Sequence, residues 1–134
     1  MAEEITKDGV LYAIIHRKDD WQTGLNFITP DDTFIQAGTF WYQAGQKCKA
    51  HRHIRNDRPN EFTQECNIVM SGSMAATIYD NDDKVLHTEL LRAGDLIVVL
   101  AGGHGYEILE DNTKVVECKN GPFVSVEKDK IPIS

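Results

Sequence analysis

The sequence has no long apolar segment and no paired cysteines, and both absences narrow its class. Its longest apolar run covers residues 96–101, far short of the roughly 20 residues that a membrane-spanning helix needs. Its three cysteines form no Cys-x-x-Cys pair; an odd count at wide spacing favours reduced thiols and a cytoplasmic location. The first residues lack a basic region followed by an apolar core, so no signal peptide is predicted.

Positive charge is also scarce. The chain carries 14 Lys and Arg against 21 Asp and Glu, a formal net charge of −7, which disfavours nucleic acid or an anionic membrane as a partner. Residues 47–58 depart from this balance, because five basic side chains there accompany only Asp57. The basic residues are Lys47, Lys49, Arg52, Arg55 and Arg58. This segment is therefore expected to attract a small anionic ligand, although an ordinary solvated rim would have the same composition.

Helical periodicity, internal repeats and low-complexity linkers are all missing. At 134 residues, with 41% hydrophobic residues, the chain is expected to form one domain over residues 1–134. Short runs rich in β-branched and aromatic residues alternate with turn sequences. These runs are 10–16, 25–28, 34–42, 68–70, 74–79, 85–91, 96–100, 106–109 and 115–118. Eight to ten such strands predict an all-β antiparallel sandwich or barrel.

A possible metal site follows from the histidines. On a strand, His51 and His53 would point to one face about 6.6 Å apart and could converge on one ion through bonds of about 2.1 Å. Glu65 would add an oxygen ligand, and His104 follows an apolar strand in a glycine-rich turn. A His-x-His pair alone is common on solvated strands, so the later carboxylate and third imidazole carry the argument.

These residues together resemble the two signature motifs of the cupin family. The first motif is Gly, five residues, His-x-His, a short spacer, Glu, six residues and Gly. It is present as Gly45, His51, His53, Glu65 and Gly72, with an eleven-residue spacer.

The second cupin motif is Gly, five residues, Pro-x-Gly and then His. It corresponds to Gly94, Gly102 and His104, with Leu100 where proline is usual and with the histidine one residue early.

The chain also resembles a group of small single-domain cupins that are often encoded beside sugar-nucleotide and polysaccharide genes. Three runs carry this narrower resemblance, which covers roughly residues 10–130, and Arg58 also matches, seven residues before the glutamate. The runs are Phe62-Thr63-Gln64-Glu65, Gly102-Gly103-His104-Gly105-Tyr106-Glu107 and Lys119-Asn120-Gly121-Pro122-Phe123.

The resemblance implies a double-stranded β-helix, a jelly-roll-like antiparallel barrel at roughly residues 34–124. It also implies one divalent transition metal held by His51, His53, Glu65 and His104. Fe, Mn, Zn, Ni and Cu all suit three imidazoles and a carboxylate, so the sequence does not choose among them.

Residues near the motif are candidates for substrate contact and catalysis. Arg58, Arg55, Lys49 and Gln64 are the predicted substrate-binding residues. Glu107 and Tyr106 directly follow His104 and could supply acid–base function. Structural roles are equally open: Tyr106 could be a core residue, and Glu107 could hold a ligand histidine in one tautomer.

Three functions fit this pattern. The first is a metal-dependent isomerase or epimerase acting on a small anionic metabolite such as a sugar or sugar phosphate. The alternatives are an Fe(II)-dependent dioxygenase and a non-catalytic sugar-binding module. Metal-free cupin epimerases use a His-Asp dyad and a tyrosine, so a full set of metal ligands favours a metal-dependent mechanism.

Several residues outside the motifs also carry predictions. The strand at 96–100 is apolar on both faces, so its outer face needs cover, and a homodimer is predicted to supply it. His16 and His87 are interpreted as surface residues. Cys66 is interpreted as a small buried hydrophobe and not as a ligand; the roles of Cys48 and Cys118 stay open.

Overall fold

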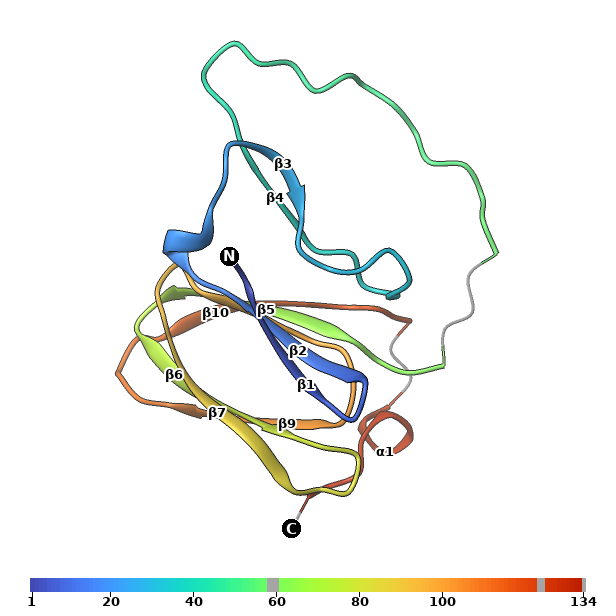
Figure 1. Ribbon diagram of the computed structural model, residues 1–134, viewed down its shortest axis with the longest axis vertical. Helices are drawn as coiled ribbons and strands as arrows, with labels where there is room; N and C mark the ends of the chain where they lie inside the picture. The colour runs from blue at the N-terminus through green and yellow to red at the C-terminus, as the bar shows by residue number, and fades with distance from the viewer. Residues whose placement is uncertain (58–60, 123–124, 134) are drawn as a thin grey trace.

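The computed structural model describes residues 1–57, 61–122 and 125–133, and these form antiparallel β-structure (Figure 1). Their strands are β1 (Glu3–Lys7), β2 (Val10–His16), β3 (Gly24–Phe27), β4 (Gly38–Trp41), β5 (Glu65–Ser71), β6 (Ser73–Tyr79), β7 (Val85–Arg92), β8 (Leu96–Val99), β9 (Gly103–Ile108) and β10 (Lys114–Lys119). A 3-10 turn (Lys18–Asp20) and a one-turn helix α1 (Val126–Asp129) complete the described elements. The predicted all-β class is therefore confirmed.

The strands form three sheets, in the orders β1-β2-β8-β5-β10, β3-β4 and β7-β6-β9. Every pairing is antiparallel, and in the described residues no sheet closes into a barrel. The five-stranded and three-stranded sheets face one another, and β3-β4 extends beyond them as a separate hairpin (Figure 1).

The main core lies between the two larger sheets. Ile15 and Ile97, from the central strands β2 and β8, are fully buried in one cluster with Met74, Ile78 and Leu91 from the opposite sheet. Complete burial of side chains of this size stabilises the fold by about 1.5–3 kcal/mol each. This layer packs the two larger sheets against one another.

The outer face of β2 and β8 is covered by the same chain. Ile14 and Val98 are fully buried there in a second cluster, against Ile28, Ile35 and Ala37. The segment that carries these three residues connects β3 to β4. The apolar outer face at 96–100 is thus covered without a second subunit, which removes the reason originally given for a homodimer.

The turn between β6 and β7 is organised by one carboxylate. Asp80 Oδ1 accepts hydrogen bonds from the backbone amides of Asp82 (2.9 Å) and Lys84 (3.1 Å). Its Oδ2 lies 2.6 Å from Nζ of Lys7, at the end of β1. The side chain of Asp80 is only 4% exposed, so this contact fastens the N-terminal strand to the second sheet.

Sequence patterns located most of the strands. β1 was missed, and the strand predicted over 34–42 is confined to β4. His51 and His53 were expected on a strand, which is wrong: the structure assigns no strand within residues 42–57. The residues of the 54–64 insert that the structure describes also lack strands and helices, as predicted for a loop.

Three predictions of burial or exposure have different outcomes. Cys66 is buried, as predicted, and burial raises the pKa of its thiol to about 11. His16, expected at the surface, is only 3% exposed, because it ends β2 opposite Leu96 in the central part of the sheet. Burial also lowers the pKa of its imidazole. His87 keeps a side chain 29% exposed at the edge of the second sheet.

Among the described residues, no helix has the length and apolar character needed to cross a membrane.

The Asp80 contacts predict an acid-dependent loss of stability. The hydrogen bond from Lys7, with the backbone amides of Lys84 and Asp82, lowers the pKa of the Asp80 carboxyl from 3.8 to about 2. The carboxylate therefore contributes fully to stability above about pH 4, and this contribution is lost as the pH falls toward 2. Asp80→Asn should lower the Tm at pH 7, and its gap to wild type should shrink below pH 4 in thermal unfolding.

The exposed Asp82 supplies the control, since Asp82→Asn leaves the carboxylate contacts of Asp80 in place. A gap between wild type and Asp80→Asn that stays constant from pH 5 to pH 2 would contradict the assignment.

Candidate functional site

The candidate site lies where β5 of one sheet faces β9 of the other. Glu65 is the first residue of β5 and pairs with Val99 of the central strand β8. It is 6% exposed. His104 and Tyr106 are two apart on β9, so strand alternation points both side chains to one face. The two sheets therefore bring a carboxylate, an imidazole and a phenol together.

One oxygen of Glu65 is the centre of this group. Its Oε1 lies 2.9 Å from Nε2 of His104 and accepts hydrogen bonds from the Tyr106 hydroxyl at 3.1 Å and from Nδ2 of Asn67 at 2.9 Å. Nδ2 of Asn67 also lies 2.9 Å from the Tyr106 oxygen. Three donors therefore converge on a single carboxylate oxygen, while the other oxygen takes no part in these contacts.

These contacts determine the charge state of the group. Burial opposes ionisation of Glu65, but the hydrogen bond and charge of His104, with Asn67 and Tyr106, lower the pKa of its carboxyl to about 2. Burial, and then the neighbouring charge of Glu65, raise the pKa of the Tyr106 hydroxyl. Glu65 is therefore ionised and Tyr106 protonated at neutral pH, so the phenol donates and the carboxylate accepts.

His51 and His53 form a second, separate pair. Both are exposed and lie outside any strand, with ring centroids 5.1 Å apart and the rings nearly perpendicular. Nδ1 of His51 lies 3.0 Å from the Lys49 carbonyl oxygen. Within the described ranges, the group of three or more His, Cys, Asp or Glu side chains close enough to share an ion is Glu3, His87 and Glu89. The structure thus joins Glu65 to His104 and His51 to His53, but it does not join the two pairs.

The predicted substrate-binding residues have different surroundings. Lys49 and Arg55 are exposed, and Arg55 is 4.0 Å from Asp57 with both side chains over 90% exposed. Gln64 has a structural position: its Oε1 accepts from the Ile35 amide at 3.1 Å, and its Nε2 donates to the Leu100 carbonyl at 3.2 Å. Arg58 lies outside the described residues.

The two predicted catalytic residues also differ. Tyr106 contacts Glu65 directly. Glu107 is exposed, and alternation along β9 points it away from the face that carries His104 and Tyr106.

Two features were missed by the sequence analysis. Asn67 could have been identified, because it lies two residues after Glu65 on β5 and so shares its face. The other is a shallow hollow of about 420 Å³ whose lining includes neither Glu65 nor His104. It is lined by Trp21, Phe40, Trp41, Tyr42, Gln46 and Cys48. Five of these residues lie between positions 40 and 48, so the aromatic run Phe40-Trp41-Tyr42 was the available signal, while Trp21 is distant in the sequence.

Comparison of the chain with protein-family models, with curated proteins and with solved structures finds no match in any of the three.

The polar contacts around Glu65 predict the effect of removing one hydroxyl. Tyr106→Phe keeps the ring but removes a donor to Glu65 and the oxygen that lies beside Asn67. Loss of a part-buried hydrogen bond to a charged group should lower the free energy of unfolding by about 1.5–3 kcal/mol. Urea unfolding at neutral pH measures this change.

Tyr42→Phe is the matched control, because Tyr42 is 39% exposed, and it should change the free energy of unfolding by less than about 0.5 kcal/mol. Equal effects of the two substitutions would show that the Tyr106 hydroxyl contributes nothing to the group.

Proposed function

We propose that the protein is a cupin-type metalloprotein that binds one divalent transition metal through His51, His53, Glu65 and His104. It acts on a small anionic metabolite, such as a sugar or sugar phosphate, in an isomerisation or epimerisation. The observation that carries this proposal is the 2.9 Å contact between Glu65 and His104 across the two facing sheets. The paired antiparallel sheets with a core between them support a cupin fold.

The four proposed ligands form two pairs, Glu65 with His104 and His51 with His53, and each pair fits a metal differently. Two ligand atoms on one ion, with bonds of about 2.1 Å at right angles, lie about 3 Å apart, close to the separation of Glu65 Oε1 and His104 Nε2. Asn67 and Tyr106 hold the carboxylate as outer partners commonly hold metal ligands. His51 and His53 complete the four-ligand set only if the segment that carries them folds toward Glu65. The proposal therefore requires metal binding to bring this segment to Glu65.

The parts of the site have distinct roles in this proposal. When bound, the ion supplies Lewis-acid polarisation of a substrate hydroxyl or carbonyl. Tyr106 holds a proton beside the site, and its hydroxyl and the Asn67 side chain fix the orientation of the Glu65 carboxylate. Lys49 and Arg55, exposed next to the two loop histidines, would attract the anionic group of the substrate.

A second candidate function needs no metal. Glu65 contacts both His104 and Tyr106. The three side chains form a carboxylate–imidazole pair with a protonated phenol beside it. The carboxylate would orient His104 through Nε2, leaving Nδ1 to accept a proton from a substrate carbon. Tyr106 would return a proton. This acid–base mechanism uses only residues that the structure already brings together, and metal analysis separates it from the first.

The metal proposal predicts the result of removing the loop histidines. His51→Ala/His53→Ala should lower the metal content of purified protein by one ion per chain, measured by elemental analysis. The Tm of metal-free protein should stay within about 2 °C of wild type, because both side chains are exposed.

Arg52→Ala is the control, since Arg52 lies between the two histidines and is equally exposed. Unchanged metal content in the double variant would reject the four-ligand site. Oxygen consumption with bound iron would favour the dioxygenase, and ligand binding without turnover would favour the sugar-binding module.

The homodimer also remains a proposal, now on a different surface. Leu25, Phe27, Phe40 and Trp41 on the β3-β4 hairpin are 46–64% exposed, and a two-stranded sheet is marginal without cover. Light scattering at micromolar concentration should give twice the chain mass, and Phe40→Asp should shift it toward the monomer. Val85→Asp, at a 63% exposed position on β7, should not. A monomeric mass for wild type would reject the proposal.

A further inference from the structure

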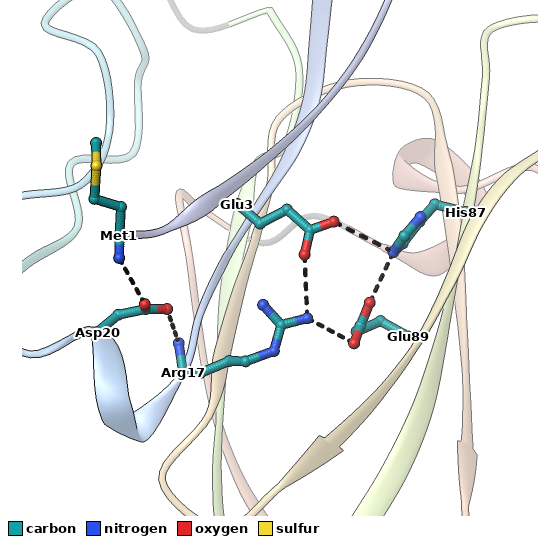
Figure 2. Close-up of polar contacts among 6 residues, drawn as sticks. All are labelled: Met1, Glu3, Arg17, Asp20, His87 and Glu89. Carbon is teal, nitrogen blue, oxygen red and sulfur yellow. Dashed lines mark hydrogen bonds and ion pairs between the residues drawn. The ribbon is translucent and has the colours of Figure 1, made fainter.

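A second cluster of His and Glu side chains lies at the edges of the two facing sheets (Figure 2). We call Glu3, Arg17, His87 and Glu89 the edge cluster. Glu3 belongs to β1, the edge strand of the five-stranded sheet, and Arg17 directly follows β2. His87 and Glu89 are two apart on β7, the edge strand of the three-stranded sheet. The cluster therefore spans the two layers.

The two carboxylates of this cluster divide their oxygens between two partners. Nη2 of Arg17 lies 3.2 Å from Oε1 of Glu3 and 2.6 Å from Oε1 of Glu89. Nε2 of His87 lies 3.9 Å from Oε2 of Glu3 and 2.8 Å from Oε2 of Glu89. Figure 2 shows the four side chains as a closed ring. Arg17 thus occupies one oxygen of each carboxylate and leaves the other directed at the imidazole.

We propose that a divalent transition metal ion such as Zn²⁺ binds between His87, Glu3 and Glu89, while Arg17 keeps its contacts. One ligand atom from each of the three residues lies within 4.8 Å of the others. An ion with bonds of about 2.0–2.2 Å holds its ligand atoms about 3–4 Å apart, so small side-chain movements close the site. One imidazole and two carboxylates are a donor set that such ions accept.

The charge of the cluster also favours a cation. Two carboxylates face one guanidinium, so with a neutral imidazole one negative charge is left uncompensated. Arg17 orients both carboxylates in the way that outer partners orient metal ligands. The ligand side chains are 22–42% exposed, so an ion can reach them from solvent, and water can complete its coordination.

Binding at this position would join β1 to β7. Ile5 is the buried residue of β1, and the far end of the strand is held by Lys7 and Asp80. A metal at Glu3 would secure the other end, so occupancy should stabilise the fold by mass action. This proposal is independent of the site at Glu65 and uses none of its residues.

The test is a calorimetric titration of Zn²⁺ into EDTA-treated full-length protein that carries His51→Ala/His53→Ala. This background removes the loop histidines, so we expect one remaining ion per chain. Adding Glu3→Gln should weaken Zn²⁺ binding by about tenfold or more, and adding His87→Ala should abolish it. Glu4→Gln is the matched control, because Glu4 is the exposed neighbour of Glu3 on the same strand, and it should leave binding unchanged.

Thermal unfolding provides a second readout. At Zn²⁺ about 100-fold above the dissociation constant, the Tm of the background protein should rise by about 5–10 °C. The rise should persist in Glu4→Gln and disappear in His87→Ala. Circular dichroism shows whether each variant is folded, and His87→Gln replaces His87→Ala if the latter is not.

Absence of Zn²⁺ binding in the background protein, or binding unaffected by Glu3→Gln and by the His87 substitution, would overturn the proposal and leave the cluster as an ion-pair network. The four-ligand site fails separately, if wild type and the His51→Ala/His53→Ala protein bind the same number of ions.

Discussion

Two central strands that are apolar on both faces constrain the whole structure. β2 and β8 pair with one another, and Ile14, Ile15, Ile97 and Val98 are fully buried on alternating faces. One face of the β2-β8 pair packs against the three-stranded sheet, and the other face needs cover from another segment or another subunit. The connection between β3 and β4 supplies that cover with Ile28, Ile35 and Ala37. The side chain of Gln64 bridges this connection to the end of β8 through Ile35 and Leu100.

The polar group at Glu65 depends on this layering. A buried carboxylate is costly unless donors replace its water, and here one strand of each large sheet contributes donors. Asn67 comes from β5 itself, while His104 and Tyr106 come from β9. The same convergence suits either a metal ligand or an acid–base pair, because both need an ionised carboxylate with a fixed orientation. The difference between the two functions lies in the segment that carries His51 and His53.

The sequence predicted strands best where burial imposes a pattern. The runs at 10–16, 74–79 and 85–91 match β2, β6 and β7 closely, because their side chains pack in the two large sheets. β1 was missed, although Asp8 and Gly9 both have positive φ in the turn before β2, and an Asp-Gly pair is a strong hairpin signal.

The candidate site was predictable only in part. Glu65 and His104 were identified from spacing, but the motif also implied a strand through His51 and His53. In the structure, residues 42–57 are exposed throughout, so no apolar face fixes a strand register there. Residue types and spacing therefore identified the candidate ligands. How these ligands are arranged in space depends on packing, and residues 42–57 have no packed face.

The N-terminal strand shows how polar contacts can replace a core. β1 buries only Ile5 among its five residues, which is little apolar area to offset the entropy of ordering a strand. Its two ends instead reach the opposite sheet through charged groups, Lys7 with the buried Asp80 and Glu3 with the edge cluster. Exposed ion pairs contribute little by themselves, so the contact at Asp80 holds its end more strongly. The end at Glu3 is held by more exposed groups, and there a bound cation would add most to the attachment of β1.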